Sequence, residues 1–76
     1  MNTFLEFNDL YSTAYASLKQ IPVEFEQKGN RVIFLLPNTP ATTDALIEYN
    51  SNPQIRVLDF VHHCKKIRAK MIALRT

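Results

Sequence analysis

The sequence predicts a small single α+β domain in which helices cover an antiparallel β-hairpin. Three patterns predict this class: a helical period near the N-terminus, two strand-like segments joined by Gly29-Asn30, and a helical period over the last third of the chain. Seventy-six residues suit one domain, so we expect residues 1–76 to form it. The expected order is helix, strand, strand, helix, short strand, helix.

A first helix is expected over residues 9–19, because apolar side chains recur at four-residue spacing from Leu10 onward. Asn8 is the expected N-cap. Asp9 would then lie in the first turn, where a negative charge favours the helix dipole. Pro22 ends the helix, since the residue before a proline avoids the helical region.

A β-hairpin is expected next. Apolar and polar residues alternate from Ile21 to Lys28, which is typical of a half-buried strand, and residues 31–36 form its partner. Gly29 and Asn30 offer the positive φ angles of a two-residue turn. If Lys28 faces Arg31, the core face holds Val32 and the pairs Phe25–Phe34 and Val23–Leu36. The other face then pairs Glu24 with Leu35 and Glu26 with Ile33.

The second half of the chain is expected to be mostly helical. Thr39 caps a helix that has Pro40 at its first position and runs to about Asn50. Residues 54–57 are expected to form a short third strand. A last helix over residues 58–74 has an inward seam and a flanking stripe. The seam is Phe60, Cys64, Ile67, Met71 and Leu74, and the stripe is Val61, Arg68 and Ile72.

Several short segments, in this order and spacing, resemble a family of short bacterial and phage domains of unknown function. They are residues 7–11, 29–34 and Thr39-Pro40, followed by Tyr49, Val57, Phe60, Lys66 and Arg68. The resemblance covers roughly residues 7–70 and agrees with the fold expected above. It implies no catalytic residue. Where family members commonly have a Gly after the first helix, this chain has Gln20-Ile21-Pro22.

The residues argue against an enzyme, a metal site and a cofactor. His62, His63 and Cys64 are consecutive, so one helix would point them about 100° apart. Cys64 also lies on the apolar seam, where burial disfavours a reactive thiolate. A single Gly leaves no Gly-rich phosphate loop. Tyr11, Tyr15 and Tyr49 could line a ligand site, but at helical spacing they favour the core edge. We therefore expect no small-molecule ligand.

The charge is divided along the chain. Residues 1–53 hold three Lys or Arg and six Asp or Glu, for a net charge of −3. Residues 54–76 hold six Lys or Arg and one Asp, for a net charge of +5. Such a basic helix could bind phosphates through Lys65, Lys66, Arg68 and Lys70. The cations could equally be a solvated face, favour the helix dipole or meet the acidic part of the chain.

The sequence thus predicts a non-enzymatic domain that acts by binding. The leading hypothesis is a protein-interaction or self-association module that uses Ile33 and Leu35 of the hairpin, or Val61 and Ile72 of the last helix. The alternative is a nucleic-acid-associated accessory protein that uses the basic helix. The longest apolar run is far shorter than a membrane span. With one Cys and no targeting segment, the expected location is the cytoplasm.

Overall fold

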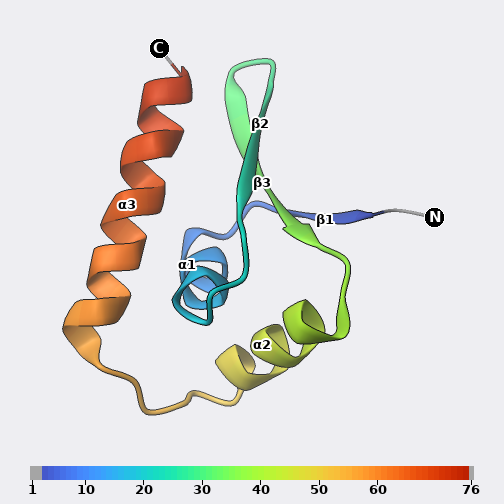
Figure 1. Cartoon of the computed structure of the whole chain (residues 1–76). Coiled ribbons are helices and arrows are strands. Elements are labelled where there is room, and N and C mark those ends of the chain that lie inside the picture. Colours follow the sequence, from blue (N-terminus) through green and yellow to red (C-terminus); the bar gives the residue numbers. More distant parts are fainter. Residues whose placement is uncertain (1–2, 76) are drawn as a thin grey trace.

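The computed structural model describes residues 3–75 and shows the predicted α+β class (Figure 1). Its elements are β1 (Phe4–Phe7), α1 (Leu10–Leu18), β2 (Glu24–Lys28), β3 (Arg31–Pro37), α2 (Pro40–Asn50) and α3 (Val57–Arg75). The structure adds one strand that the sequence analysis missed, β1. The strand expected over residues 54–57 is wrong: this segment connects α2 to α3, which already begins at Val57.

The sheet has the order β1-β3-β2 and both pairings are antiparallel. The predicted hairpin register is confirmed from Lys28↔Arg31 to Glu24↔Leu35. The expected Val23–Leu36 pair lies outside the ladder, because β2 begins only at Glu24. In the turn, Gly29 has φ +63°, whereas Asn30 does not have a positive φ. A positive φ at the first central position alone is the type II′ pattern, so only Gly29 needs its conformational freedom.

Strand β3 is the central strand, which explains its composition. It has hydrogen-bonded neighbours on both sides, and four of its residues, Val32, Ile33, Phe34 and Leu36, are buried. A central strand of this kind shows an almost continuous apolar run instead of alternation. Strand β1 pairs with the second half of β3, from Phe7↔Phe34 to Phe4↔Pro37. Its four residues therefore continue both faces of the hairpin.

Helix α1 begins and ends with local hydrogen bonds that differ from expectation. Its N-cap is Asp9, whose carboxylate accepts the backbone N–H of Ser12 at 3.0 Å, so the expected cap Asn8 is wrong. The helix ends in a Schellman motif: the N–H of Ile21 donates to the carbonyl of Ala16, and the N–H of Gln20 donates to that of Ser17. Gln20 has φ +67°, a position that favours glycine.

Helix α2 begins as predicted. The Thr39 hydroxyl accepts the backbone N–H of Thr42, and Pro40 is at the first helical position. The connection after α2 turns at Asn52, which has φ +59° and is followed by Pro53. Asparagine tolerates this left-handed conformation better than most residues. The turn carries the chain from the end of α2 to the start of α3.

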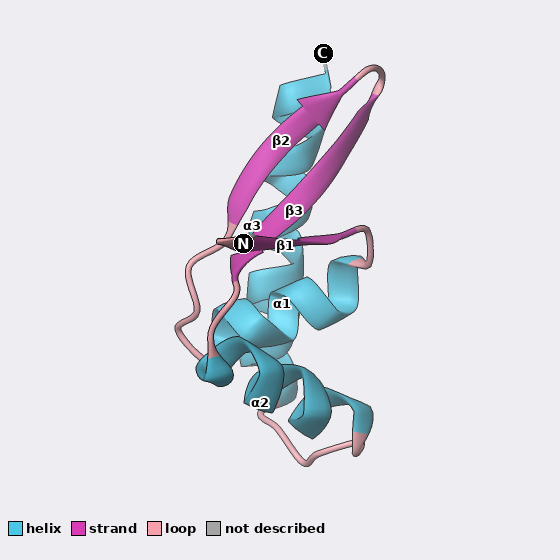
Figure 2. Ribbon diagram, turned by 90° about the vertical axis from the view of Figure 1, so that its right-hand side faces the viewer, coloured by secondary structure: helices cyan, strands magenta, loops and turns pink. Residues whose placement is uncertain are grey.

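The three helices pack on one side of the sheet, and two apolar clusters form the core. The first cluster joins α1 and α3 to the sheet around Ala14, Phe34 and Ile67. The second joins α1 and α2 to the sheet around Ala16, Leu36 and Ala45. In Figure 2 the sheet lies in front of α3, and no helix covers its near face. The core face predicted for the hairpin is confirmed, since Phe25 and Phe34 meet edge to face at 5.5 Å.

Candidate interaction surfaces

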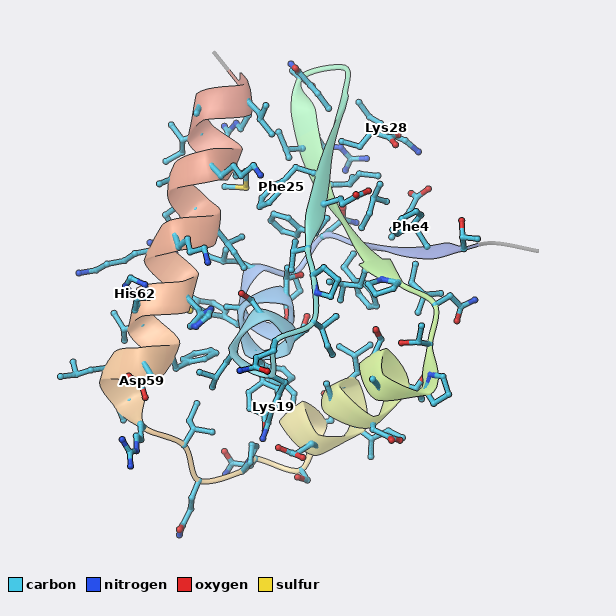
Figure 3. The ribbon with its side chains drawn as sticks, in the orientation of Figure 1. Phe4, Lys19, Phe25, Lys28, Asp59 and His62 are labelled. Carbon is cyan, nitrogen blue, oxygen red and sulfur yellow. The ribbon has the colours of Figure 1, made fainter. Side chains whose placement is uncertain are left out.

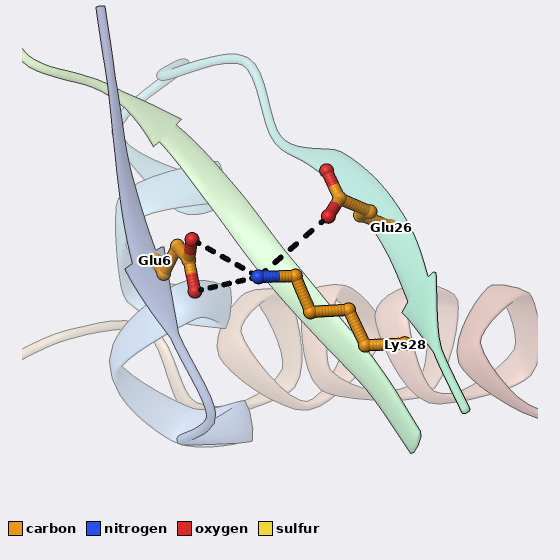
Figure 4. Close-up of polar contacts among 3 residues, drawn as sticks. All are labelled: Glu6, Glu26 and Lys28. Carbon is orange, nitrogen blue, oxygen red and sulfur yellow. Dashed lines mark hydrogen bonds and ion pairs between the residues drawn. The ribbon is translucent and has the colours of Figure 1, made fainter. Parts of the chain in front are cut away.

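The outer face of the sheet is covered only in part by its own side chains, and a hollow of about 450 Å³ remains beside Phe4, Glu6 and Leu35. Ile33 is only 4% exposed, although it belongs to neither apolar cluster and no helix lies over it. Lys28 crosses β3 with its ammonium 3.3 Å from Glu6 and 3.8 Å from Glu26 (Figure 4). The aliphatic parts of these long side chains can cover an apolar neighbour while their charges stay in water. Ile33 is therefore not offered to a partner, and the half-buried Leu35 is only partly accessible.

The inward seam of α3 is confirmed over most of its length. Cys64 and Ile67 are buried, and Phe60 and Met71 pack against the same cluster. Leu74 is 37% exposed, because the helix extends past the cluster at its C-terminal end. Among the described residues, no group of three or more His, Cys, Asp or Glu could hold a metal ion.

A second seam runs along α3, one residue after the first. We call it the α3 stripe: Leu58, Val61, Lys65, Arg68 and Ile72, spaced by three, four, three and four residues. Leu58 is 80% exposed and Ile72 is 50% exposed, while Val61 is half-buried. Lys65 and Arg68 are exposed. The stripe is therefore apolar at both ends and cationic in its middle. Of its residues, only Val61, Arg68 and Ile72 belonged to the flanking stripe predicted from the sequence.

The four predicted basic residues are all exposed, but they do not form one surface. Lys65 and Arg68 lie on the α3 stripe. Lys66 and Lys70 lie on the other flank, where they line a cavity with His63 and Phe25. From helix geometry the two pairs point roughly 150° apart. The Lys70 ammonium lies 4.8 Å from the centre of the Phe25 ring, so part of this flank belongs to the packing of α3 on the hairpin.

The histidine on this flank is held by α1. Its Nδ1 lies 2.8 Å from the Ser17 hydroxyl. Burial lowers the pKa of His63, and the positive charge of Lys66 lowers it further. His63 therefore resists protonation and adds little positive charge beside Lys66 near neutral pH. Cys64 is buried, and burial raises the pKa of its thiol.

The three tyrosines meet in one cleft between α1, the end of α2 and the start of α3. We call it the aromatic cleft; it has a volume of about 440 Å³ and four aromatic residues in its wall, Tyr11, Tyr15, Tyr49 and Phe60. Tyr15 and Tyr49 have ring centres 5.7 Å apart, and Tyr11 and Phe60 are 6.5 Å apart. Ile55, Asn50 and Asn52 complete most of the wall.

Two of the tyrosines differ sharply in exposure. Tyr15 is 1% exposed, and its hydroxyl donates a hydrogen bond to Glu48, which also pairs with Lys19 at 2.8 Å. Figure 3 shows Lys19 in this region, near α2. Tyr11 is 49% exposed. All three tyrosines were expected at the core edge, which is wrong for the fully buried Tyr15.

None of the helices in residues 3–75 is both long and apolar enough to cross a membrane. No family model matches this chain, and no match to it was found among the curated proteins or the solved structures. The resemblance to short bacterial and phage domains therefore stays a prediction.

Proposed function

We propose that this chain is a non-enzymatic, cytoplasmic protein-interaction module that binds its partner along the α3 stripe. The exposure of Leu58 and Ile72 carries the proposal. Both are large apolar side chains on a regular helix, and both lie outside the seam that the core uses. Covering a Leu or Ile side chain fully is worth about 1.5–3 kcal/mol, which gives a partner an apolar contact at each end of the helix.

The charge of the stripe specifies the partner. A binding segment needs apolar side chains for Leu58 and Ile72 and acidic side chains for Lys65 and Arg68 between them. A second copy of this chain is a poor occupant. Two stripes packed antiparallel would match Leu58 with Ile72 but place Lys65 against Lys65, and like charges at close range are destabilising. We therefore infer a different protein with an acidic, amphipathic segment as the partner.

The test is a screen of displayed amphipathic helical peptides whose charges are left free. We expect selected peptides to carry Asp or Glu midway between two apolar positions. Binding should then be lost in the double variant Lys65→Glu with Arg68→Glu. The matched control is Lys66→Glu with Lys70→Glu, which changes the net charge of the same helix equally but on its other flank. Peptides that lose binding equally to both variants, or a screen that enriches no acidic peptides, would contradict the proposal.

Self-association has its own measurement. Sedimentation equilibrium at high protein concentration should show a monomer, because the cationic middle of the stripe opposes pairing of two copies. A concentration-dependent dimer that Leu58→Asp disrupts would replace the heterologous partner with a second copy of this chain. The interaction surface would then be retained, and the inference about an acidic partner would be wrong.

Nucleic-acid binding is the second candidate, and one observation favours it. Lys65, Lys66, Arg68 and Lys70 are exposed, and none forms an ion pair with any residue from 3 to 75. Each flank presents two of these cations, so two phosphate contacts would make the logarithm of the affinity fall with the logarithm of salt with a slope of about 1.8. Fluorescence anisotropy with mixed-sequence DNA and RNA at low salt tests this. Both double charge reversals should weaken such binding, and affinity that is independent of salt would exclude it.

A further inference from the structure

The aromatic cleft has the composition of a ligand site and lies apart from the exposed lysines of α3. Its volume of about 440 Å³ is within the range of small-molecule clefts. Four of its wall residues are aromatic, and among the described residues that line it none carries a formal charge. Tyr11 keeps about half of its surface in water, so one ring remains open to a ligand.

Three rings of the cleft, Tyr11, Tyr49 and Phe60, remain for a cation, whereas the Lys19 ammonium already lies 5.6 Å from the centre of the Tyr15 ring. The faces of Tyr and Phe rings carry negative potential and attract an ammonium group within about 6 Å of the ring centre. Asn50, in the wall, is the last residue of α2, and the C-terminal end of a helix carries partial negative charge. Asp9 adds a full negative charge nearby: burial raises the pKa of Tyr49, and the charge of Asp9 raises it further.

We propose that the aromatic cleft binds a compact alkylated ammonium group against Tyr11, Tyr49 and Phe60. The rings supply both the apolar contact for the alkyl groups and the attraction for the positive charge. The group can be part of a free quaternary amine or of a methylated lysine side chain, since the cleft would contact the same head group in both. This departs from the expectation that so small a chain has no small-molecule site, and it does not depend on the proposed partner of α3.

The first experiment compares two ligands on the native chain by NMR titration. Choline is the cationic probe, and 3,3-dimethylbutan-1-ol is its neutral isostere. We expect choline to bind with a dissociation constant on the order of 1 mM and to shift resonances of the cleft. The isostere should bind at least about 3-fold more weakly, because it lacks the charge. Equal affinities, or no shift with either ligand, would overturn the proposal.

The second experiment assigns the site with variants. Tyr11→Leu removes the accessible ring and should weaken choline about 2- to 5-fold, whereas Tyr11→Phe retains a ring and should bind almost normally. Phe4→Leu is the matched control, because Phe4 is an aromatic residue of similar exposure at 40% that lies on β1, outside the cleft. Choline affinity that is unchanged in Tyr11→Leu, or reduced equally in Phe4→Leu, would refute the site.

The two sources of the head group are then separated with amino-acid probes. Acetylated trimethyl-lysine amide presents the group as a peptide would, and acetylated lysine amide is its unmethylated counterpart. If the trimethylated probe binds more tightly than both its unmethylated counterpart and choline, the head group belongs to a side chain of a partner protein. Choline that binds as tightly as trimethyl-lysine indicates a free amine. A preference for unmethylated lysine would overturn the alkylated-ammonium assignment.

Discussion

Gln20 occupies a backbone position that is usually filled by glycine. It follows α1 with φ +67° and occupies the position of a Schellman motif at which glycine is most common. Its own N–H bonds to Ser17 at 2.9 Å and the next N–H, of Ile21, bonds to Ala16 at 3.0 Å, so the conformation is fixed from both sides. Ile21 is buried against Ala16 in the second apolar cluster, which locks the turn further.

Gln20→Gly is therefore expected to stabilise the protein. The left-handed conformation costs an L-residue about 1–2 kcal/mol, and glycine avoids this cost. The greater conformational freedom of glycine in the unfolded chain offsets about 0.4–1 kcal/mol of the resulting gain in stability. The Gln20 side chain is exposed, so its removal costs little packing. The net increase in the free energy of unfolding is about 0.5–1 kcal/mol, or roughly 2–8 °C in Tm for a domain of this size.

Urea denaturation followed by circular dichroism measures this change, with an unchanged m-value showing that the unfolding transition is the same. Gln20→Ala is the control, because it removes the same side chain without relieving the backbone, and it should change stability by less than about 0.5 kcal/mol. Asn52→Gly should gain less than Gln20→Gly, since Asn tolerates φ +59°. A Gln20→Gly variant no more stable than Gln20→Ala would refute the argument from backbone conformation.

Three further predictions concern buried or paired side chains. Ile33→Ala should cost about 2–5 kcal/mol in urea denaturation and clearly more than Leu35→Ala; equal costs would mean that Ile33 is not buried as described. The hydrogen bond from Lys19 lowers the pKa of Glu48 below 4.5, so this stabilisation is present above that pH and lost as pH falls through the lowered pKa. Glu48→Gln should flatten that acid limb, and an identical limb would contradict the pairing. Cys64 should react with a thiol reagent slowly in the folded chain and rapidly in urea, because burial raises its pKa and limits access; equal rates would exclude its burial.

The hairpin was predictable because its register depends on local residues. Once Gly29 fixes the turn, every pair from Lys28↔Arg31 to Glu24↔Leu35 follows, and alternation places Phe25 and Phe34 on the core face. The start of β2 was not predictable in the same way. The alternating pattern begins at Ile21, but the Schellman motif of α1 uses the backbone N–H of Ile21, so the strand begins three residues later.

Strand β1 escaped prediction because it has four residues and no turn beside it. Phe4–Phe7 pairs with β3, which lies more than twenty residues further along the chain. Nothing local marks such a strand, whereas residues 54–57 contain the β-branched Ile55 and Val57, which are common in strands. The aromatic cleft has the same origin. Tyr11 and Tyr49 are distant in sequence, and only the packing of α1 against both other helices brings their rings to one wall.

The basic character of α3 shows what a sum of charges omits. A net charge of +5 over residues 54–76 predicts one basic surface, but a helix distributes consecutive residues around its axis, and its neighbours decide what each flank does. Lys70 lies over Phe25 and helps to cover the hairpin, so its charge is partly engaged in packing. Lys65 and Arg68 stand instead between exposed apolar residues. The two double charge reversals change the net charge equally, so an effect of net charge alone should weaken binding equally in both. Binding through the α3 stripe should instead be lost only when Lys65 and Arg68 are reversed.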